Sequence, residues 1–151
     1  MNANPVSDAM AVQAAKIVNQ NLPSLLENPQ SELFRTLASR ASLLEGLAFS
    51  NTKTALAHNI SYEMTLKHGL THGLACSFTL PMVWRLAQGK LADRDSVLNQ
   101  IYGYKLINPA EELEKFFDKV GVSCNFKDYG VTEHEASQML ERAMQGPRGK
   151  N

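Results

Sequence analysis

The sequence predicts an all-α fold, and three observations support this prediction. Stretches in which apolar and polar residues alternate, the pattern of a half-buried strand, are nearly absent. Asn-Pro pairs at residues 4–5, 28–29 and 108–109 each precede an amphipathic run. Asparagine can accept a bond from a free helix N–H, and proline suits the first helical position. Apolar residues also recur at helical spacing, as at Leu33, Leu37, Leu44 and Leu47.

The first expected helix covers about Val6–Glu27, where Pro23 would introduce a kink. The second covers about Ser31–Phe49 and the third about Thr52–Thr65. Both lie in a region rich in Ala, Gly and Ser, "TLASRASLLEGLAFSNTKTALAH". Small residues at helical spacing let two backbones approach closely. We therefore expect both helices to be buried on several sides, with the four leucines in the core.

After a break, a fourth helix is expected to begin near His72 and to be interrupted near Pro81. Two later helix starts carry capping-box patterns, Asn108 with Glu111 and Thr132 with Glu135. Together these elements predict a single all-helical domain over residues 1–151. The later helices are expected over about Ala92–Tyr102, Ala110–Val120 and Glu133–Met144.

Composition excludes several functional classes. Lys and Arg balance Asp and Glu at 15 each, so no basic field exists for nucleic acid or an anionic membrane. No apolar run approaches the roughly 18 to 20 residues that span a bilayer. The N-terminus, "MNANPVSDAM", lacks the basic and apolar regions of a secretory signal. Cys76 and Cys124 are far apart in the sequence, which favours reduced thiols and a cytoplasmic location.

Three of the four histidines fall within 15 residues, in "HNISYEMTLKHGLTHGLACSFTLP". A lone histidine is more often structural than a ligand, but several together favour a metal, because imidazole is the commonest metal ligand. His68 and His72 are four apart and would share one helical face. Gly69 instead favours a turn that opens a new helix at His72. From the residues alone, a metal or substrate site and a set of structural histidines stay equally open.

The longer stretch "FSNTKTALAHNISYEMTLKHGLTHGLACSFTLP" resembles the C-terminal helical domain of the iron-containing (group III) alcohol dehydrogenases, which share the dehydroquinate synthase-like fold. In that family a small-residue helix ends in "HA"-like or "HG"-like text, and "HGxANAxxLP" opens the helix after the next loop. Here "AHNISY" and "THGLACSFTLP" take those places. The resemblance extends over essentially the whole chain. Within the family, "HGLACSFTLP" is most similar to the branch associated with phosphonate metabolism.

The resemblance implies that His58 and His72 are two of four protein ligands of a divalent metal, Fe²⁺ or Zn²⁺ as its substitute. The other two, an Asp and a His one helical turn apart, are expected just upstream of residue 1, after a nucleotide-binding domain that holds NAD(P). This chain would then be the C-terminal half of a two-domain oxidoreductase, and inactive by itself. The complete enzyme would transfer hydride between NAD(P) and an alcohol or aldehyde, phosphonate aldehydes among them.

Three further residues receive roles from the same resemblance. Tyr62 takes a position where many members carry a proton-relaying histidine, although a tyrosine hydroxyl is a poor relay at neutral pH and simple aromatic packing is equally open. His68, in the loop that borders the substrate, and Lys67, the nearby cation for an anionic substrate, are candidates for facing the substrate. Cys76 lies four residues after His72, but its apolar neighbours favour a buried small hydrophobe.

The expected partner of the complete enzyme is a small-molecule alcohol or aldehyde, with no nucleic acid and no membrane. Surface that the nucleotide-binding domain would cover also predicts self-association of this chain. The competing hypothesis is a non-enzymatic helical interaction domain whose histidines are structural.

Overall fold

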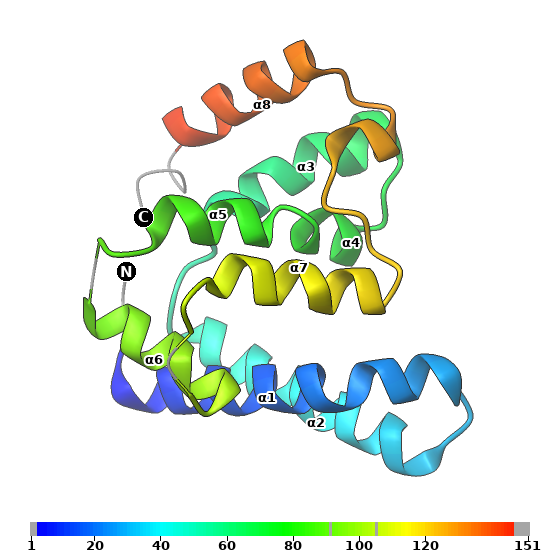
Figure 1. Cartoon of the computed structure of the whole chain (residues 1–151), viewed down its shortest axis with the longest axis vertical. Helices are drawn as coiled ribbons and strands as arrows, with labels where there is room; N and C mark the ends of the chain where they lie inside the picture. Colours follow the sequence, from blue (N-terminus) through cyan, green and yellow to red (C-terminus); the bar gives the residue numbers. More distant parts are fainter. Residues whose placement is uncertain (1–2, 91, 105, 147–151) are drawn as a thin grey trace. The chain divides into compact units, whose positions relative to one another are not determined.

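The computed structural model describes residues 3–90, 92–104 and 106–146, without the side chains of 92–94. These residues form α-helices and one short 3₁₀ helix, and none of them lies in a strand (Figure 1). The predicted all-α fold is therefore confirmed. Among the described residues, no helix has both the length and the apolar character that crossing a membrane requires.

Contacts within the chain divide it into two compact units. Unit 1 holds the residues up to Lys53 together with Gln88–Pro109, and unit 2 holds Thr54–Ala87 together with the residues from Ala110 onward. The single domain expected over residues 1–151 stays a prediction.

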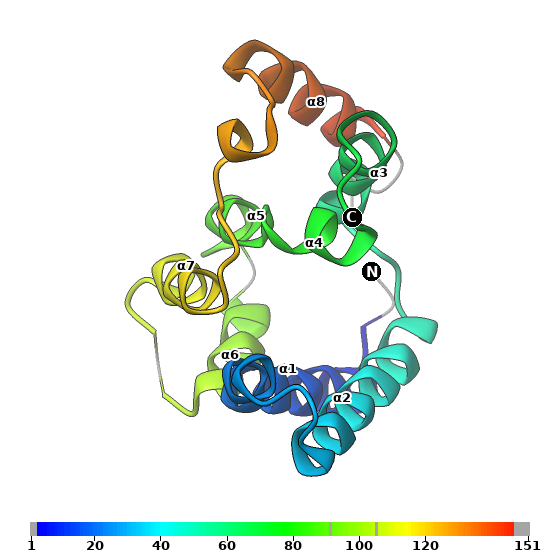
Figure 2. The same ribbon diagram turned by 90° about the vertical axis from the view of Figure 1, so that its right-hand side faces the viewer.

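Unit 1 is built on two long helices, α1 (Pro5–Glu27) and α2 (Glu32–Ser50), and α6 (Ala92–Tyr102) packs on α1 (Figure 2). The start of α1 has the expected chemistry, because Pro5 is its first residue and the side-chain oxygen of Asn4 accepts bonds from the backbone N–H groups of Val6 and Ser7, both at 3.0 Å. The Ser7 hydroxyl in turn accepts from the Asn4 N–H, which completes a capping box.

The start of α2 differs from the expectation for the second Asn-Pro pair. Asn28 ends α1, where its N–H donates to the Ser24 carbonyl at 3.0 Å, and Pro29 lies in the turn that follows. Ser31 caps α2 instead, with its hydroxyl accepting from the Phe34 N–H. The predicted role of Asn28–Pro29 as a helix start is wrong, because the turn at residues 29–30 separates this pair from the cap of α2.

Small residues bury the surface between α1 and α2. Ala14, Ala41 and Ala48 are each at most 5% exposed, as close backbone approach requires. In contrast, Leu33 is 63% and Leu47 is 45% exposed, so their predicted core positions are wrong. The small residues of these helices are buried instead, and the two leucines are exposed.

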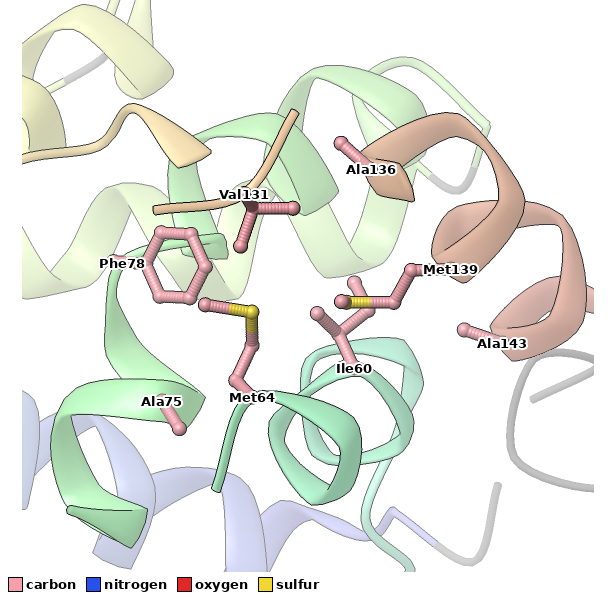
Figure 3. Close-up of a cluster of buried hydrophobic side chains, with 8 residues drawn as sticks. All are labelled: Ile60, Met64, Ala75, Phe78, Val131, Ala136, Met139 and Ala143. Carbon is pink, nitrogen blue, oxygen red and sulfur yellow. The ribbon is translucent and has the colours of Figure 1, made fainter. Parts of the chain in front are cut away.

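Unit 2 comprises α3 (Leu56–His68), α4 (His72–Ser77), α5 (Leu80–Ala87), α7 (Pro109–Lys119), the 3₁₀ helix η1 (Phe126–Tyr129) and α8 (Glu133–Gln145). Only the first residue of α7, Pro109, is assigned to unit 1. Helix α3 contacts α4, α5 and α8. One cluster of buried side chains joins α3, α4, the segment before α8, and α8 itself (Figure 3). Its members are Ile60, Met64, Ala75, Phe78, Val131, Ala136, Met139 and Ala143.

Helix boundaries in unit 2 differ from the predicted ones at two places. Helix α3 begins four residues later than expected, at Leu56, and ends at His68. The helix that begins at His72 is interrupted near Pro81, as predicted, because α4 ends at Ser77 and Pro81 is the second residue of the next helix, α5. The turn at η1 was not predicted. The start of α8 agrees with the prediction, because Thr132 and Glu135 form the expected capping box.

Candidate metal centre

The buried face of α3 decides where its polar side chains lie. This face points into the core of unit 2 (Figure 3). With about 100° of rotation per residue, His58 and Tyr62 fall on one flank of that face, and Glu63 and Lys67 fall on the opposite flank. The buried residues that define the face are Ala57, Ile60, Ser61 and Met64.

A glycine turn brings α4 back against α3. Gly69 has φ +70°, in the left-handed region that favours glycine, and it caps α3. The Leu70 N–H then donates to the Met64 carbonyl at 3.3 Å. His72 is consequently the first residue of α4, as predicted, and Ala75 reaches the same core as Met64 with no exposed surface.

This arrangement brings His58 and His72 together. Their ring centroids are 5.2 Å apart and the ring planes meet at 76°. The Sγ atom of Cys76 lies 3.7 Å from Nδ1 of His58 and 3.6 Å from Nε2 of His72. One nitrogen from each ring and this sulfur all lie within 4.8 Å of one another. In the part of the chain that the structure describes, no other group of three His, Cys, Asp or Glu side chains converges in this way.

The cluster is open to solvent on one side. His72 is exposed, whereas His58 and Cys76 are partly buried. The Tyr62 ring stacks on His72, with centroids 6.4 Å apart and planes at 27°, and it is itself 45% exposed. An ion could therefore reach the donor atoms from solvent, while Tyr62 covers one face of the outer imidazole.

The donor set fits a divalent metal of the zinc or ferrous type. Imidazole nitrogen and thiolate sulfur are common ligands of Zn²⁺, and imidazole also suits iron. The three donors come from α3 and α4, both packed on one core, so little rearrangement is needed to bring them to one ion. Zn²⁺ or Fe²⁺ suits this set better than Mg²⁺ or Ca²⁺, which prefer oxygen ligands.

The structure does not bring Lys67 to this cluster. Its ammonium group is paired with the Glu63 carboxylate, which also binds Arg142 of α8 at 2.7 Å. Partial burial raises the pKa of Glu63, but the hydrogen bonds from Lys67 and Arg142 outweigh it, so this pKa falls below its usual value of 4.5. Lys67 is nine residues from His58, so the two residues lie about half a turn apart around the axis of α3, on opposite sides of the helix.

His68 also lies apart from the other two histidines. It is the last residue of α3. The pKa of Glu135 is lowered first by the hydrogen bonds that Thr132 donates to it and then, in part, by the charge of His68. Thus, of the five predicted site residues, the structure joins His58, Tyr62 and His72.

The sequence favours a buried small hydrophobe at Cys76, but the structure leaves this side chain only partly buried, with its Sγ beside both imidazoles. Its spacing of four residues from His72 is a signal for a shared helical face, and the structure agrees with it. The approach of His58 from α3 has no such signal, because it depends on how α3 and α4 pack.

Comparisons with known proteins show what the chain is similar to. The sequence pattern of the Fe-containing alcohol dehydrogenase family, C-terminal, matches residues 1–150. The chain is 26% identical to NAD-dependent methanol dehydrogenase of Bacillus methanolicus, over 95% of this chain and 40% of that protein. It is 28% identical to 1,3-propanediol dehydrogenase of Klebsiella pneumoniae, over 95% of this chain and 39% of that protein.

A solved structure shows the same fold. Sulfoacetaldehyde reductase from Bifidobacterium kashiwanohense, in complex with NAD⁺, superposes with a TM-score of 0.84 at 28% identity. The match covers 97% of this chain and 39% of that one. The chain thus spans about 40% of the length of the curated relatives named above.

Proposed function

This chain belongs to the Fe-containing alcohol dehydrogenase family and corresponds to its C-terminal part, and on that premise we propose that it provides two metal ligands, His58 and His72, to an NAD(P)-dependent dehydrogenase. The observation that supports this proposal is the meeting of these imidazoles from two helices, with ring centroids 5.2 Å apart. The reaction would interconvert a small alcohol and its aldehyde.

In this proposal, the chain holds and orients the two imidazoles that bind the metal. When bound, the metal would supply Lewis-acid polarisation of the substrate oxygen, and NAD(P) would supply or accept the hydride. Met64 and Ala75 are fully buried in one core, which keeps α3 and α4 in fixed register and the two imidazoles side by side. Tyr62 lies on one face of His72, where it excludes water from that side of the ring.

The substrate class follows from the relatives and from the opening of the site. The relatives are named for methanol, 1,3-propanediol and sulfoacetaldehyde, all small molecules. The last carries a sulfonate anion, which is similar in charge to the phosphonate aldehydes that the sequence suggested. We therefore propose a small alcohol or aldehyde, with anionic aldehydes as the class to test first, and His68 and Lys67 as candidates for contacting it.

A hybrid enzyme tests the proposal. In it, this chain replaces the aligned C-terminal segment of the Klebsiella 1,3-propanediol dehydrogenase, and NADH oxidation is measured with added Fe²⁺ and a panel of aldehydes. We expect turnover by the hybrid and at least a 100-fold loss in His58→Asn and in His72→Asn, on the order expected when a metal ligand is removed. His134→Asn, at an exposed histidine of α8, is the matched control and should keep the activity.

The same experiment distinguishes the dehydrogenase from the competing hypothesis, a non-enzymatic interaction domain with structural histidines. An active hybrid that tolerates the loss of both histidines would show that these histidines are structural and do not hold the catalytic metal. A folded but inactive hybrid, with circular dichroism like that of the host, would also count against the proposal. The 151-residue chain by itself should show no NAD(P)H oxidation, since two imidazoles are half of the four-ligand shell that the family resemblance implies.

A further inference from the structure

We propose that Cys76 is a third ligand of the metal that His58 and His72 bind, so that α3 and α4 together hold one ion through two nitrogens and one sulfur. This inference rests on the proposed function, because it assumes that the two histidines bind a metal. It extends that function by assigning a thiolate ligand, and with it a preference among metals.

The distances around the sulfur carry the proposal. In tetrahedral zinc sites, Zn–S bonds of about 2.3 Å and Zn–N bonds of about 2.0–2.1 Å place nitrogen and sulfur about 3.6 Å apart. The Sγ atom of Cys76 lies 3.7 Å from Nδ1 of His58 and 3.6 Å from Nε2 of His72. Both separations match those between two ligands of one zinc ion, and in the complete enzyme Cys76 would be added to the four ligands that the family resemblance implies.

One side chain must adjust to receive the ion. The sulfur lies 3.9 Å from Nδ1 of His72 as well as 3.6 Å from its Nε2, so it is nearly equidistant from the two ring nitrogens. Turning this ring about its Cβ–Cγ bond would aim a nitrogen lone pair at the ion. His72 is exposed at the start of α4, and its stacking partner Tyr62 is 45% exposed, so both rings have space to turn.

The packing of α4 holds the sulfur in place. Ala75, next to Cys76, has no exposed surface, and Phe78 is only 1% exposed. Both belong to the core cluster that also contains Met64 of α3 (Figure 3). Rotating α4 to withdraw Cys76 would expose these apolar side chains, so the thiol is held beside the imidazoles whether or not an ion is present.

A sulfur ligand changes which metal the site prefers. Thiolate is a soft donor that favours zinc, whereas sites for Mg²⁺ or Mn²⁺ use oxygen donors. Affinity for a given nitrogen and sulfur site also rises from Fe²⁺ to Zn²⁺. We therefore expect the 151-residue chain to bind Zn²⁺ and Co²⁺ more tightly than Fe²⁺.

Cobalt spectroscopy on the purified 151-residue chain tests the proposal. Titration with Co²⁺ under reducing conditions should produce a near-ultraviolet thiolate-to-cobalt charge-transfer band. The band should be absent in Cys76→Ser and unchanged in Cys124→Ser, which is the matched control at the only other cysteine. Zn²⁺ affinity, measured by chelator competition, should fall by at least 10-fold in Cys76→Ser, because even the loss of an outer-shell partner costs about 10- to 100-fold.

A second measurement works on the unmodified chain and so does not depend on the folding of a variant. Alkylation of Cys76 by iodoacetamide, followed by peptide mass spectrometry, should slow by at least 10-fold when Zn²⁺ is added, while alkylation of Cys124 should not change.

The outcomes separate this inference from the proposed function. Co²⁺ binding that depends on both histidines but gives no charge-transfer band would overturn the role of Cys76 and leave the histidine pair standing. A band that persists in Cys76→Ser, or unchanged alkylation of Cys76 with Zn²⁺, would also overturn it. Failure to bind Co²⁺ or Zn²⁺ at all would count against both the thiolate ligand and metal binding by the isolated histidine pair.

Discussion

The imidazole rings of His58 and His72 lie 5.2 Å apart and at 76° to each other, although 13 residues and a left-handed turn separate them in the chain. His58 comes from the first turn of α3 and His72 from the first residue of α4. Two features place them together, namely the turn at Gly69 and the core that α3 and α4 share. The predictions below test each feature and the charges around it.

Metal binding should stabilise the fold of unit 2, because the ligands come from two helices. A ligand at 100 times its dissociation constant adds about 2.7 kcal/mol to the free energy of unfolding. We expect excess Zn²⁺ to raise the thermal midpoint of the chain, followed by circular dichroism. The shift should vanish in His72→Asn and persist in His134→Asn. An equal shift in both variants would locate the bound zinc elsewhere.

The turn at Gly69 should be sensitive to any side chain. An added Cβ at Gly69 would meet no atom within 4 Å, so a substitution costs only backbone strain at φ +70°. We expect Gly69→Ala to reduce the free energy of unfolding by about 1–2 kcal/mol and to weaken zinc binding. Gly46 is a helical glycine of α2 with equally open space, and Gly46→Ala should be neutral or stabilising by up to about 1 kcal/mol. Urea denaturation measures both.

Alanine substitutions at two residues of α3, one buried and one exposed, distinguish the contribution of core packing from that of helix propensity. Met64 has no exposed surface, whereas Leu66 is 84% exposed. Met64→Ala should cost about 2–5 kcal/mol, because it leaves a cavity in the core that sets the register of α3 and α4. Leu66→Ala should change the free energy of unfolding by less than about 0.5 kcal/mol. Similar losses in both variants would show that the described core does not carry the stability of unit 2.

The Glu63 carboxylate should make stability depend on pH in the acid range. Its pKa lies below the usual 4.5 in the folded chain, because the hydrogen bonds from Lys67 and Arg142 outweigh the opposing effect of burial. Its contribution is therefore complete above the unfolded pKa and is lost as pH falls through the folded value. Glu63→Gln should reduce the free energy of unfolding by about 0.2–1 kcal/mol at neutral pH.

The difference between Glu63→Gln and the parent chain should shrink as the pH falls from neutral through the folded pKa of Glu63, because the carboxyl then becomes protonated in both states. Urea denaturation at neutral pH and at a series of acid pH values gives the comparison. Glu141→Gln, at an exposed carboxylate of α8, is the control. A loss that stays constant with pH would mean that Glu63 acts through packing and not through charge.

Lys67 can be tested as the contact for an anionic substrate in the hybrid enzyme. In the structure its ammonium is paired with Glu63, so it would have to adopt another rotamer to reach an anion beside His58. If it does, Lys67→Ala should raise KM for a sulfonate or phosphonate aldehyde and leave a neutral aldehyde unchanged. Lys127→Ala removes another paired surface lysine and serves as the control. If Lys67→Ala leaves KM unchanged for the anionic aldehyde as well as for the neutral one, Lys67 does not contact the substrate.

Much of the helical architecture could be predicted from local patterns. The bounds of α6 agree with the prediction, and the capping box of Thr132 with Glu135 starts α8 where expected. These features depend on contacts within one helical turn. Leu33 and Leu47 were misplaced because helical spacing shows which residues share a face, but not whether small or large residues meet the neighbouring helix.

Some features of the candidate site could likewise be predicted from the sequence, and others could not. The histidine-rich stretch and the glycine between its helices are visible in the sequence, and so is the spacing of four residues between His72 and Cys76. The sequence by itself therefore determined the helical class, the family resemblance and the choice of His58 and His72. Only the tertiary structure decided that Cys76 approaches both imidazoles and that Glu63 also pairs with Arg142 of α8. The reason is physical: spacing fixes directions around one helix, whereas meetings between helices depend on how their buried faces pack.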